Sequence, residues 1–189
     1  MPKLRIITVN ALFRMITQLL LLSVLPAQST LLHEQITVGF SAQQQAHNIV
    51  IHAIRQAKKS IHIAAFVLSE KQIIEALIAA SHKGVAVHII IDHQQSCVDR
   101  KPLTRQNHLR RLATITSLSA IYPPKRLHSK YMLIDQLHVQ TGSFNYSAAA
   151  AYHNQENVIY LQHVPQLATR YFANWQALYR LSEPLKEGC

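Results

Sequence analysis

The first half of the chain alternates between short apolar runs and stretches with helical spacing. Residues 36–40 alternate apolar and polar positions, and residues 61–68 and 85–91 are almost continuously apolar, so each run predicts a β-strand. Between these runs, apolar residues recur at helical spacing over residues 46–57 and 73–78. This β-α-β-α-β order predicts an α/β domain with a mixed, largely parallel β-sheet flanked by helices on both faces.

The second half of the chain continues the same pattern. Four more strands are predicted, over residues 120–122, 131–134, 137–141 and 158–161. Three more helices are predicted, over residues 102–112, 142–151 and 166–181. A turn at Asp135-Gln136 separates two of the strands, which is typical of a hairpin. The last helix has an apolar face made by Leu167, Tyr171, Trp175 and Leu178.

The first 29 residues have the pattern of an export signal. A basic start precedes the apolar run 15–25, and Ala27-Gln28-Ser29 offers small residues for cleavage before Thr30. We therefore expect residues 1–29 to be a signal peptide and residues 30–189 to form a single domain of an exported protein, periplasmic or secreted. An uncleaved N-terminal membrane anchor is the alternative, although the run is shorter than the roughly 20 apolar residues that span a bilayer.

Charge and cysteine content narrow the class of partner. The 19 Lys and Arg residues against 9 Asp and Glu residues give a net charge of +10, which favours a polyanionic partner, either nucleic acid or an anionic lipid surface. Simple solubility would explain the same excess. Cys97 and Cys189 are too few for a disulfide framework, and whether they pair with each other or across a dimer stays open.

Residues 127–146 bring a histidine and a lysine close together. His128 and Lys130 are two apart on a predicted strand, so their side chains project from the same face. An imidazole can attack phosphorus or transfer a proton near neutral pH, and an ammonium can hold a phosphate oxygen. A lone His-x-Lys pair arises often by chance, so this pair needs support from its neighbours.

That support comes from the residues that follow. Gly142 permits a tight turn, and Ser143 and Asn145 offer hydrogen-bond donors where a helix is expected to begin, which is a natural cradle for phosphate. Glu156 is a carboxylate that could orient and stabilise an imidazolium. With this spacing, chance is a poor explanation, and the chain is predicted to be a phosphodiesterase.

Residues outside this segment are weaker candidates. Asp92 follows a predicted strand, where it could lie near the site or cap a turn. Five basic residues could line a phosphate-binding surface or form an ordinary solvated face: Arg105, Arg110, Arg111, Lys125 and Arg126.

The segment HSKYMLIDQLHVQTGSFN, which begins at His128, resembles the His-x-Lys-x4-Asp-x6-Gly-Ser-x-Asn motif of the phospholipase D superfamily. The resemblance extends to Glu156-Asn157 and covers about residues 36–180. It is closest to the small, single-motif, metal-independent endonucleases of bacteria, and it implies a phospholipase D-like α-β-α sandwich.

The resemblance also implies a mechanism. Members of the family bring two motifs together, so a chain with one motif is expected to work as a homodimer whose motifs meet at the interface. One His128 would attack phosphorus and form a phosphohistidine, and the other would protonate the leaving oxygen. The remaining implied roles are phosphate binding by Lys130 and Asn145, assistance by Ser143, orientation of His128 by Glu156, and structural roles for Asp135 and Gly142. Neither a metal nor another cofactor is implied.

Three functions remain open on the sequence alone. The leading prediction is a nonspecific endonuclease that cleaves DNA, with RNA as a further possible substrate. A phospholipase D that hydrolyses the headgroup phosphodiester of phospholipids would use the same chemistry. An inactive nucleic-acid-binding module is the third, and the intact His, Lys, Ser, Asn and Glu set argues against it.

Overall fold

A computed structural model describes residues 35–98 and 117–186. The predicted signal peptide, the predicted helix over residues 102–112 with its arginines, and Cys189 lie outside these described residues. None of the described helices has both the length and the apolar character that crossing a membrane requires.

Eight strands form one sheet in the order β1-β7-β6-β5-β2-β3-β4-β8. The strands are β1 (Gln35–Phe40), β2 (Ser60–Ala65), β3 (Ala86–Asp92), β4 (Ser117–Ile121), β5 (Lys130–Ile134), β6 (His138–Gly142), β7 (Asn157–Gln162) and β8 (Glu183–Pro184). The helices are η1 (Ala42–Gln44), α2 (Gln45–Gln56), α3 (Lys71–His82), η2 (Gln94–Val98), α5 (Ala148–Tyr152) and α6 (Pro165–Leu181). The α/β class is confirmed, each of the seven expected strands overlaps an observed one, and β8 is the strand that was not expected.

The sheet is mixed as expected, but the prediction that it is largely parallel is wrong. Only the β2–β3 and β3–β4 pairs are parallel, and the other five pairs are antiparallel. The reason lies in the connections: β5 and β6 form a hairpin, and β5, β6 and β7 all insert between β1 and β2. The strand–helix–strand order therefore describes the chain correctly but does not reveal which strands are neighbours.

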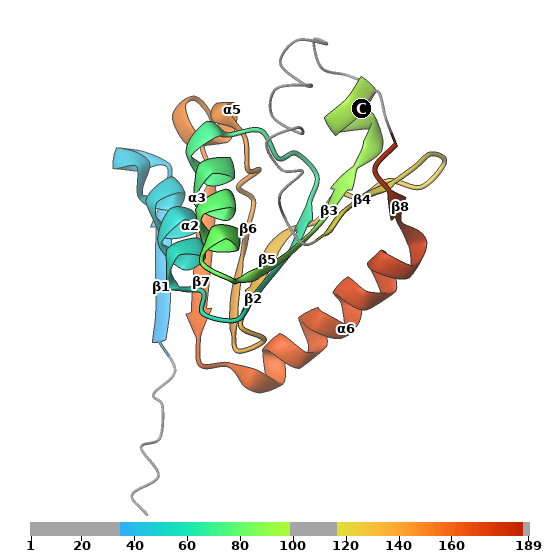
Figure 1. Cartoon of the computed structure of the whole chain (residues 1–189). Helices are drawn as coiled ribbons and strands as arrows, with labels where there is room; N and C mark the ends of the chain where they lie inside the picture. Colours follow the sequence, from blue (N-terminus) through green and yellow to red (C-terminus); the bar gives the residue numbers. More distant parts are fainter. Residues whose placement is uncertain (1–34, 99–116, 187–189) are drawn as a thin grey trace, which may run out of the picture. The chain divides into compact units, whose positions relative to one another are not determined.

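Helices cover both faces of the sheet, as expected for an α-β-α sandwich. Helices α2 and α3 lie on one face and α6 on the other (Figure 1). Along β5 the side chains alternate, so that Met132 and Ile134 pack toward α2 and α3 while Tyr131 and Leu133 pack toward α6. The indole of Trp175 on α6 donates a 3.0 Å hydrogen bond to the buried carbonyl of Ile63, which fixes this helix against β2.

The predicted helix over residues 142–151 is too long. Helix α5 begins only at Ala148, where the hydroxyl of Ser147 accepts a 3.3 Å hydrogen bond from the amide of Ala150. Gly142 instead ends β6 at φ 154°, and a Cβ there would lie 2.2 Å from the carbonyl oxygen of Asn157. The residues between them are held to the β2–α3 connection through Tyr146, so they cannot wind into a helix. Ser143 and Asn145 therefore do not lie at a helix start, and their binding of phosphate stays a prediction.

Candidate active site

A cavity of about 720 Å³ opens at the ends of three neighbouring interior strands, where β6 ends and β5 and β7 begin. It is lined by His128, Ser129, Lys130, Tyr131, Thr141, Gly142, Ser143, Asn145, Glu156, Tyr171 and Asn174. The antiparallel register of β5, β6 and β7 produces this meeting, because Tyr131 pairs with Thr141 and Gly142 pairs with Val158. Six of the residues singled out in the sequence thus come together around one cavity.

His128 and Lys130 are in direct contact at this cavity. The Lys130 ammonium donates a 2.9 Å hydrogen bond to the carbonyl of His128 and lies 3.5 Å from its Nδ1. The ring of Phe66, just after β2, lies 4.5 Å from the His128 ring and 5.0 Å from the ammonium. Burial lowers the pKa of Lys130, and the negative charge of Glu156 acts in the opposite direction.

Ser143 and Glu156 also line the cavity and contact each other. The Ser143 hydroxyl donates a 2.5 Å hydrogen bond to the Glu156 carboxylate, and it accepts one from the backbone amide of Asn157. The other carboxylate oxygen accepts from Asn154 at 3.1 Å. Among the described residues Glu156 is thus bonded to Ser143 and Asn154 rather than to His128, so its expected role in orienting the imidazole stays a prediction.

The backbone next to Asn145 is fixed by hydrogen bonds of Tyr146. The carbonyl of Tyr146 accepts from the amides of Ser69 and Glu70 at 2.7 and 3.0 Å, and the amide of Tyr146 donates to Val67 at 3.1 Å. The Oδ1 atom of Asn145 is buried without a hydrogen-bond partner among the described residues. Oδ1 can only accept a hydrogen bond, so a phosphate oxygen would have to be held by the amide nitrogen of Asn145.

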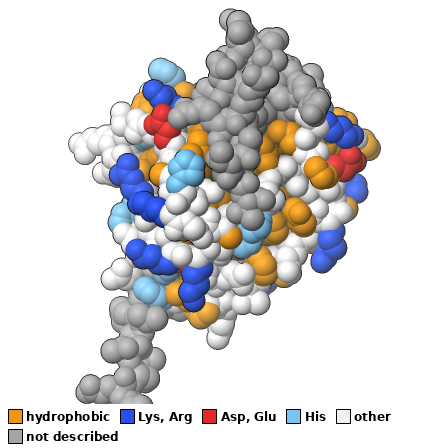
Figure 2. All heavy atoms as spheres, viewed as in Figure 1, with side chains coloured by type: hydrophobic (Ala, Val, Ile, Leu, Met, Phe, Trp, Pro, Cys, Tyr) orange, Lys and Arg blue, Asp and Glu red, His pale blue; other side chains and the backbone are white. Residues whose placement is uncertain are grey.

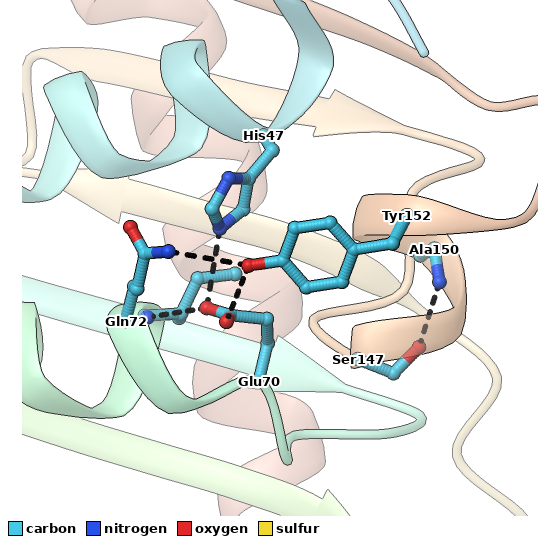
Figure 3. A network of polar contacts seen from close by, with 7 residues as sticks. His47, Glu70, Gln72, Ser147, Ala150 and Tyr152 are labelled. Carbon is cyan, nitrogen blue, oxygen red and sulfur yellow. Dashed lines mark hydrogen bonds and ion pairs between the residues drawn. The ribbon is translucent and has the colours of Figure 1, made fainter. Parts of the chain in front are cut away.

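A buried polar network holds the end of the β2–α3 connection, to which Tyr146 is bonded (Figure 3). His47 on α2 lies 3.2 Å from the carboxylate of Glu70, which also caps α3 by accepting from the amide of Ile73 at 2.7 Å. Tyr152 on α5 donates to the same carboxylate at 3.2 Å. The hydrogen bonds from Ile73 and Gln72 and the contact with His47 lower the pKa of Glu70 against the opposing effect of burial. The network thus ties α2, α3 and α5 together beneath the site.

Asp92 combines the two roles that its position allowed. It is fully buried, and its carboxylate accepts from the amide of Gln95 at 3.0 Å, as a turn cap does. It also accepts from the amide of Leu127 at 2.8 Å and from the Arg126 guanidinium at 3.3 Å. Asp92 therefore holds the segment that leads directly into His128.

Two groups of sequence candidates lie outside the cavity. Lys125 and Arg126 do not line it, and the guanidinium of Arg126 is bound to Asp92 instead. Asp135 lies at the far end of β5, where its carboxylate accepts from the backbone amides of Lys58, Lys59 and Ser60 at 2.7 to 3.1 Å. This clamp between the hairpin and the α2–β2 loop accounts for the aspartate without a part in the chemistry.

Sequence reasoning missed one wall of the cavity, made by Tyr131, Tyr171 and Asn174. The apolar face of the last helix predicted a core position for Tyr171, and the ring does pack against the core from a half-buried position. Nothing in the spacing indicated that α6 would reach a site formed by β5 and β6. The described residues include no group of three His, Cys, Asp or Glu side chains placed to hold a metal ion.

The chain is similar to known proteins in both sequence and fold. Residues 50–178 match the family described as cardiolipin synthase, PLD-like domain. The chain is 31% identical over 147 residues to phospholipase D of Rickettsia felis, which covers 78% of this chain and 70% of that protein. Its fold is similar to that of Nuc from Salmonella typhimurium, a phospholipase D family member, with a TM-score of 0.73 and 28% identity over 82% of this chain and all of that one.

A second solved structure, NucT from Helicobacter pylori, shares the fold with a TM-score of 0.68 at 18% identity, over 81% of this chain and all of that one. The family match covers more than half of the chain and includes every residue that lines the cavity. The chain belongs to the phospholipase D superfamily and is a phospholipase D-like phosphodiesterase.

Proposed function

We propose that this protein is an exported, metal-independent endonuclease that cleaves DNA. RNA is a second candidate substrate, because the same chemistry would cleave its phosphodiester bonds. The observation that carries the chemistry is the contact of His128 and Lys130 at a cavity that also presents Ser143 and Asn145. The export pattern of residues 1–29 supports the location.

The chemistry follows from these groups. His128 attacks phosphorus through a ring nitrogen, a P–N bond forms, and the P–O bond to the leaving group breaks. A second imidazole gives the leaving oxygen its proton and then takes one from water, whose oxygen attacks phosphorus and releases His128. Lys130 and Asn145 hold the phosphoryl oxygens during both steps, which supplies the charge stabilisation that the reaction needs.

The second imidazole is proposed to come from another copy of the chain. Among the described residues, His128 is the only histidine that lines the cavity, so one copy offers half of the required acid–base pair. An exposed apolar strip on β1 borders this region: Ile36, Val38 and Phe40 are 64%, 51% and 58% exposed. A contiguous apolar surface of this kind is typical of an interface.

The register shows where this strip lies. Ile36 pairs with Leu161, which packs against α6, so the strip is on the α6 side of the sheet but beyond the cover of that helix. Phe40 pairs with Asn157, whose amide is bonded to Ser143 in the cavity. A partner seated on the strip would therefore reach the site.

Nucleic acid is favoured over lipid because the cavity is lined by polar residues and the net charge is +10, or +7 without the three basic residues of segment 1–29. Lys and Arg side chains are scattered over the face seen in Figure 2, where Asp and Glu are few. Phospholipase D activity is the second candidate, because the apolar strip beside the cavity could contact acyl chains and the Rickettsia relative is called phospholipase D.

The test incubates the protein with plasmid DNA and, separately, with labelled phosphatidylcholine, each in excess EDTA. We expect nicked and linear DNA without headgroup release, and loss of cleavage in His128→Ala. Headgroup release without DNA cleavage would establish the lipid function instead. Binding of DNA without cleavage of either substrate would identify an inactive binding module.

The dimer is tested separately through the strip. Val38→Asp should give a monomer by sedimentation and abolish cleavage, whereas the β-branched Val38→Thr, which adds no charge, should keep both dimer and activity. A Val38→Asp monomer that remains fully active would contradict the shared site.

A further inference from the structure

The unassigned wall of the cavity consists of two tyrosines and an asparagine from different elements. The hydroxyl of Tyr131 on β5 donates a 2.8 Å hydrogen bond to Oδ1 of Asn174 on α6. The rings of Tyr131 and Tyr171 meet edge-on, with centroids 5.0 Å apart and planes at 75°. Tyr131 is only 5% exposed, while Tyr171 is half-buried and Asn174 is exposed.

These contacts give each of the three side chains a different role in the wall. Burial and the neighbouring Tyr171 raise the pKa of Tyr131, so it remains a neutral donor and occupies the acceptor oxygen of Asn174. The two amide hydrogens of Asn174 remain as donors. The edge-on contact fixes the Tyr171 ring, and because this side chain is only half-buried, part of the ring is open to the cavity that it lines.

The wall offers chemistry that a phosphate group does not use. Cationic and polar groups for the phosphate come from Lys130, Ser143 and Asn145 elsewhere in the cavity. A fixed aromatic face with an adjacent amide donor suits a flat, aromatic group that carries hydrogen-bond acceptors, and nucleobases are such groups. Every base has a stacking face and at least one ring nitrogen or carbonyl acceptor, so this recognition would tolerate any sequence.

We propose that Tyr171 and Asn174 contact the nucleobase next to the scissile phosphate, with Tyr171 as a stacking platform and Asn174 as a donor to the base. The proposal rests on the proposed nuclease function and extends it to the substrate. A base inside a duplex is stacked on both sides, so the platform is open only to a base that has left the stack. Single-stranded nucleic acid is therefore the favoured substrate class.

The experiment removes the ring and the base separately and together. The substrate is a short single-stranded oligonucleotide with one cleavable phosphodiester among methylphosphonate linkages, made with its flanking bases or with abasic sugars in their place. In the wild-type protein we expect base removal to lower kcat/KM about 10- to 100-fold, the range of a base–aromatic stack. Tyr171→Ala should lower kcat/KM on the base-containing substrate by a similar factor, and should make base removal nearly without effect.

Two variants control this comparison. Tyr171→Phe keeps the ring and should behave as the wild type. Tyr179→Ala removes another aromatic from α6, one that stacks on Trp175 at 5.1 Å and does not line the cavity, so base removal should cost this variant as much as the wild type. If ring removal and base removal each lower kcat/KM by the same factor whether or not the other is present, the proposal is overturned. Groups in contact give non-additive effects instead.

The outcomes also separate this proposal from the function on which it rests. If wild-type protein cleaves the oligonucleotide but ring and base act independently, the nuclease stands and the base contact is wrong. If wild-type protein leaves both oligonucleotides intact and releases phospholipid headgroups, the nuclease and the base contact are both wrong. Equal kcat/KM on single-stranded and duplex forms of the same sequence would contradict the preference for unstacked bases.

Discussion

The hydroxyl of Ser143 donates a 2.5 Å hydrogen bond to the carboxylate of Glu156. This contact joins the end of β6 to the residue that precedes β7, and both residues line the cavity that His128 also lines. Glu156 thus contacts Ser143, whereas the family resemblance implies that it contacts the imidazole of His128. The two residues therefore form a pair whose contribution to activity can be measured as a unit.

We predict that Ser143→Ala and Glu156→Gln are not independent. Each change weakens a hydrogen bond to a charged group, so each should lower kcat by roughly tenfold or more. The kcat of the double variant should lie within about twofold of the kcat of the less active single variant, because both changes disrupt one contact. Steady-state kinetics with a phosphodiester substrate in metal-free buffer measure these kcat values. A double variant whose losses multiply would show that Glu156 acts through another group.

Phe66 is predicted to position His128 and Lys130 without touching the substrate. Phe66→Leu removes the ring that both side chains contact and should lower kcat about tenfold, in line with an aromatic and a cation–π contact. Phe66→Tyr keeps the ring and should restore activity. The His128 ring signals in NMR spectra should shift in Phe66→Leu, and unchanged signals with unchanged kcat would show that the contact has no role.

Asp135 is predicted to stabilise the fold rather than the reaction. Asp135→Asn should lower the free energy of unfolding by about 2 kcal/mol, because hydrogen bonds to a charged carboxylate become bonds to an amide oxygen. Asparagine tolerates the φ of 56° found here, whereas Asp135→Ala adds backbone strain. Gln136→Asn, at φ 53° in the same turn, is the matched control. Urea unfolding measures the effect, and full specific activity of folded Asp135→Asn is expected.

Stability is predicted to fall as the pH drops from 6.5 toward 4. Burial beneath α6, and the charge of His88 stacked at 4.9 Å, lower the pKa of His62 to about 4. The unfolded chain, with an ordinary histidine pKa near 6.5, then binds the proton more readily than the folded chain. The contribution of His62 to stability is therefore fully present above pH 6.5 and is lost as the pH falls toward 4, by about 3 kcal/mol.

Thermal unfolding between pH 4 and pH 7.5 tests this slope. His62→Phe keeps a ring against Trp175 and Phe172 but cannot be protonated, so its unfolding should depend less on pH. The exposed His52 on α2 provides the control, since His52→Gln should leave the slope as it is in the wild type. A slope in His62→Phe equal to that of the wild type would place the pH dependence elsewhere.

The core and most of the motif could be predicted from the sequence because both depend on local patterns. Alternating or continuous apolar runs gave strands close to their observed bounds, and Leu167, Tyr171, Trp175 and Leu178 do pack toward the sheet. The helix over residues 142–151 failed because tertiary contacts outweighed local propensity. The carbonyl of Tyr146 accepts from Ser69 and Glu70, so this segment stays non-helical as far as Ser147.

The sequence by itself determined the family, the bond that is attacked and the residues of the motif, because a fixed spacing of His, Lys, Ser and Asn needs no knowledge of distant contacts. Only the tertiary structure decided which other residues join them. It placed Tyr171 and Asn174 of α6 on the cavity wall, Phe66 against His128, and Glu156 on Ser143. Those contacts depend on which strands are neighbours and on how α6 crosses the sheet, and such long-range pairing leaves no local signal in the chain.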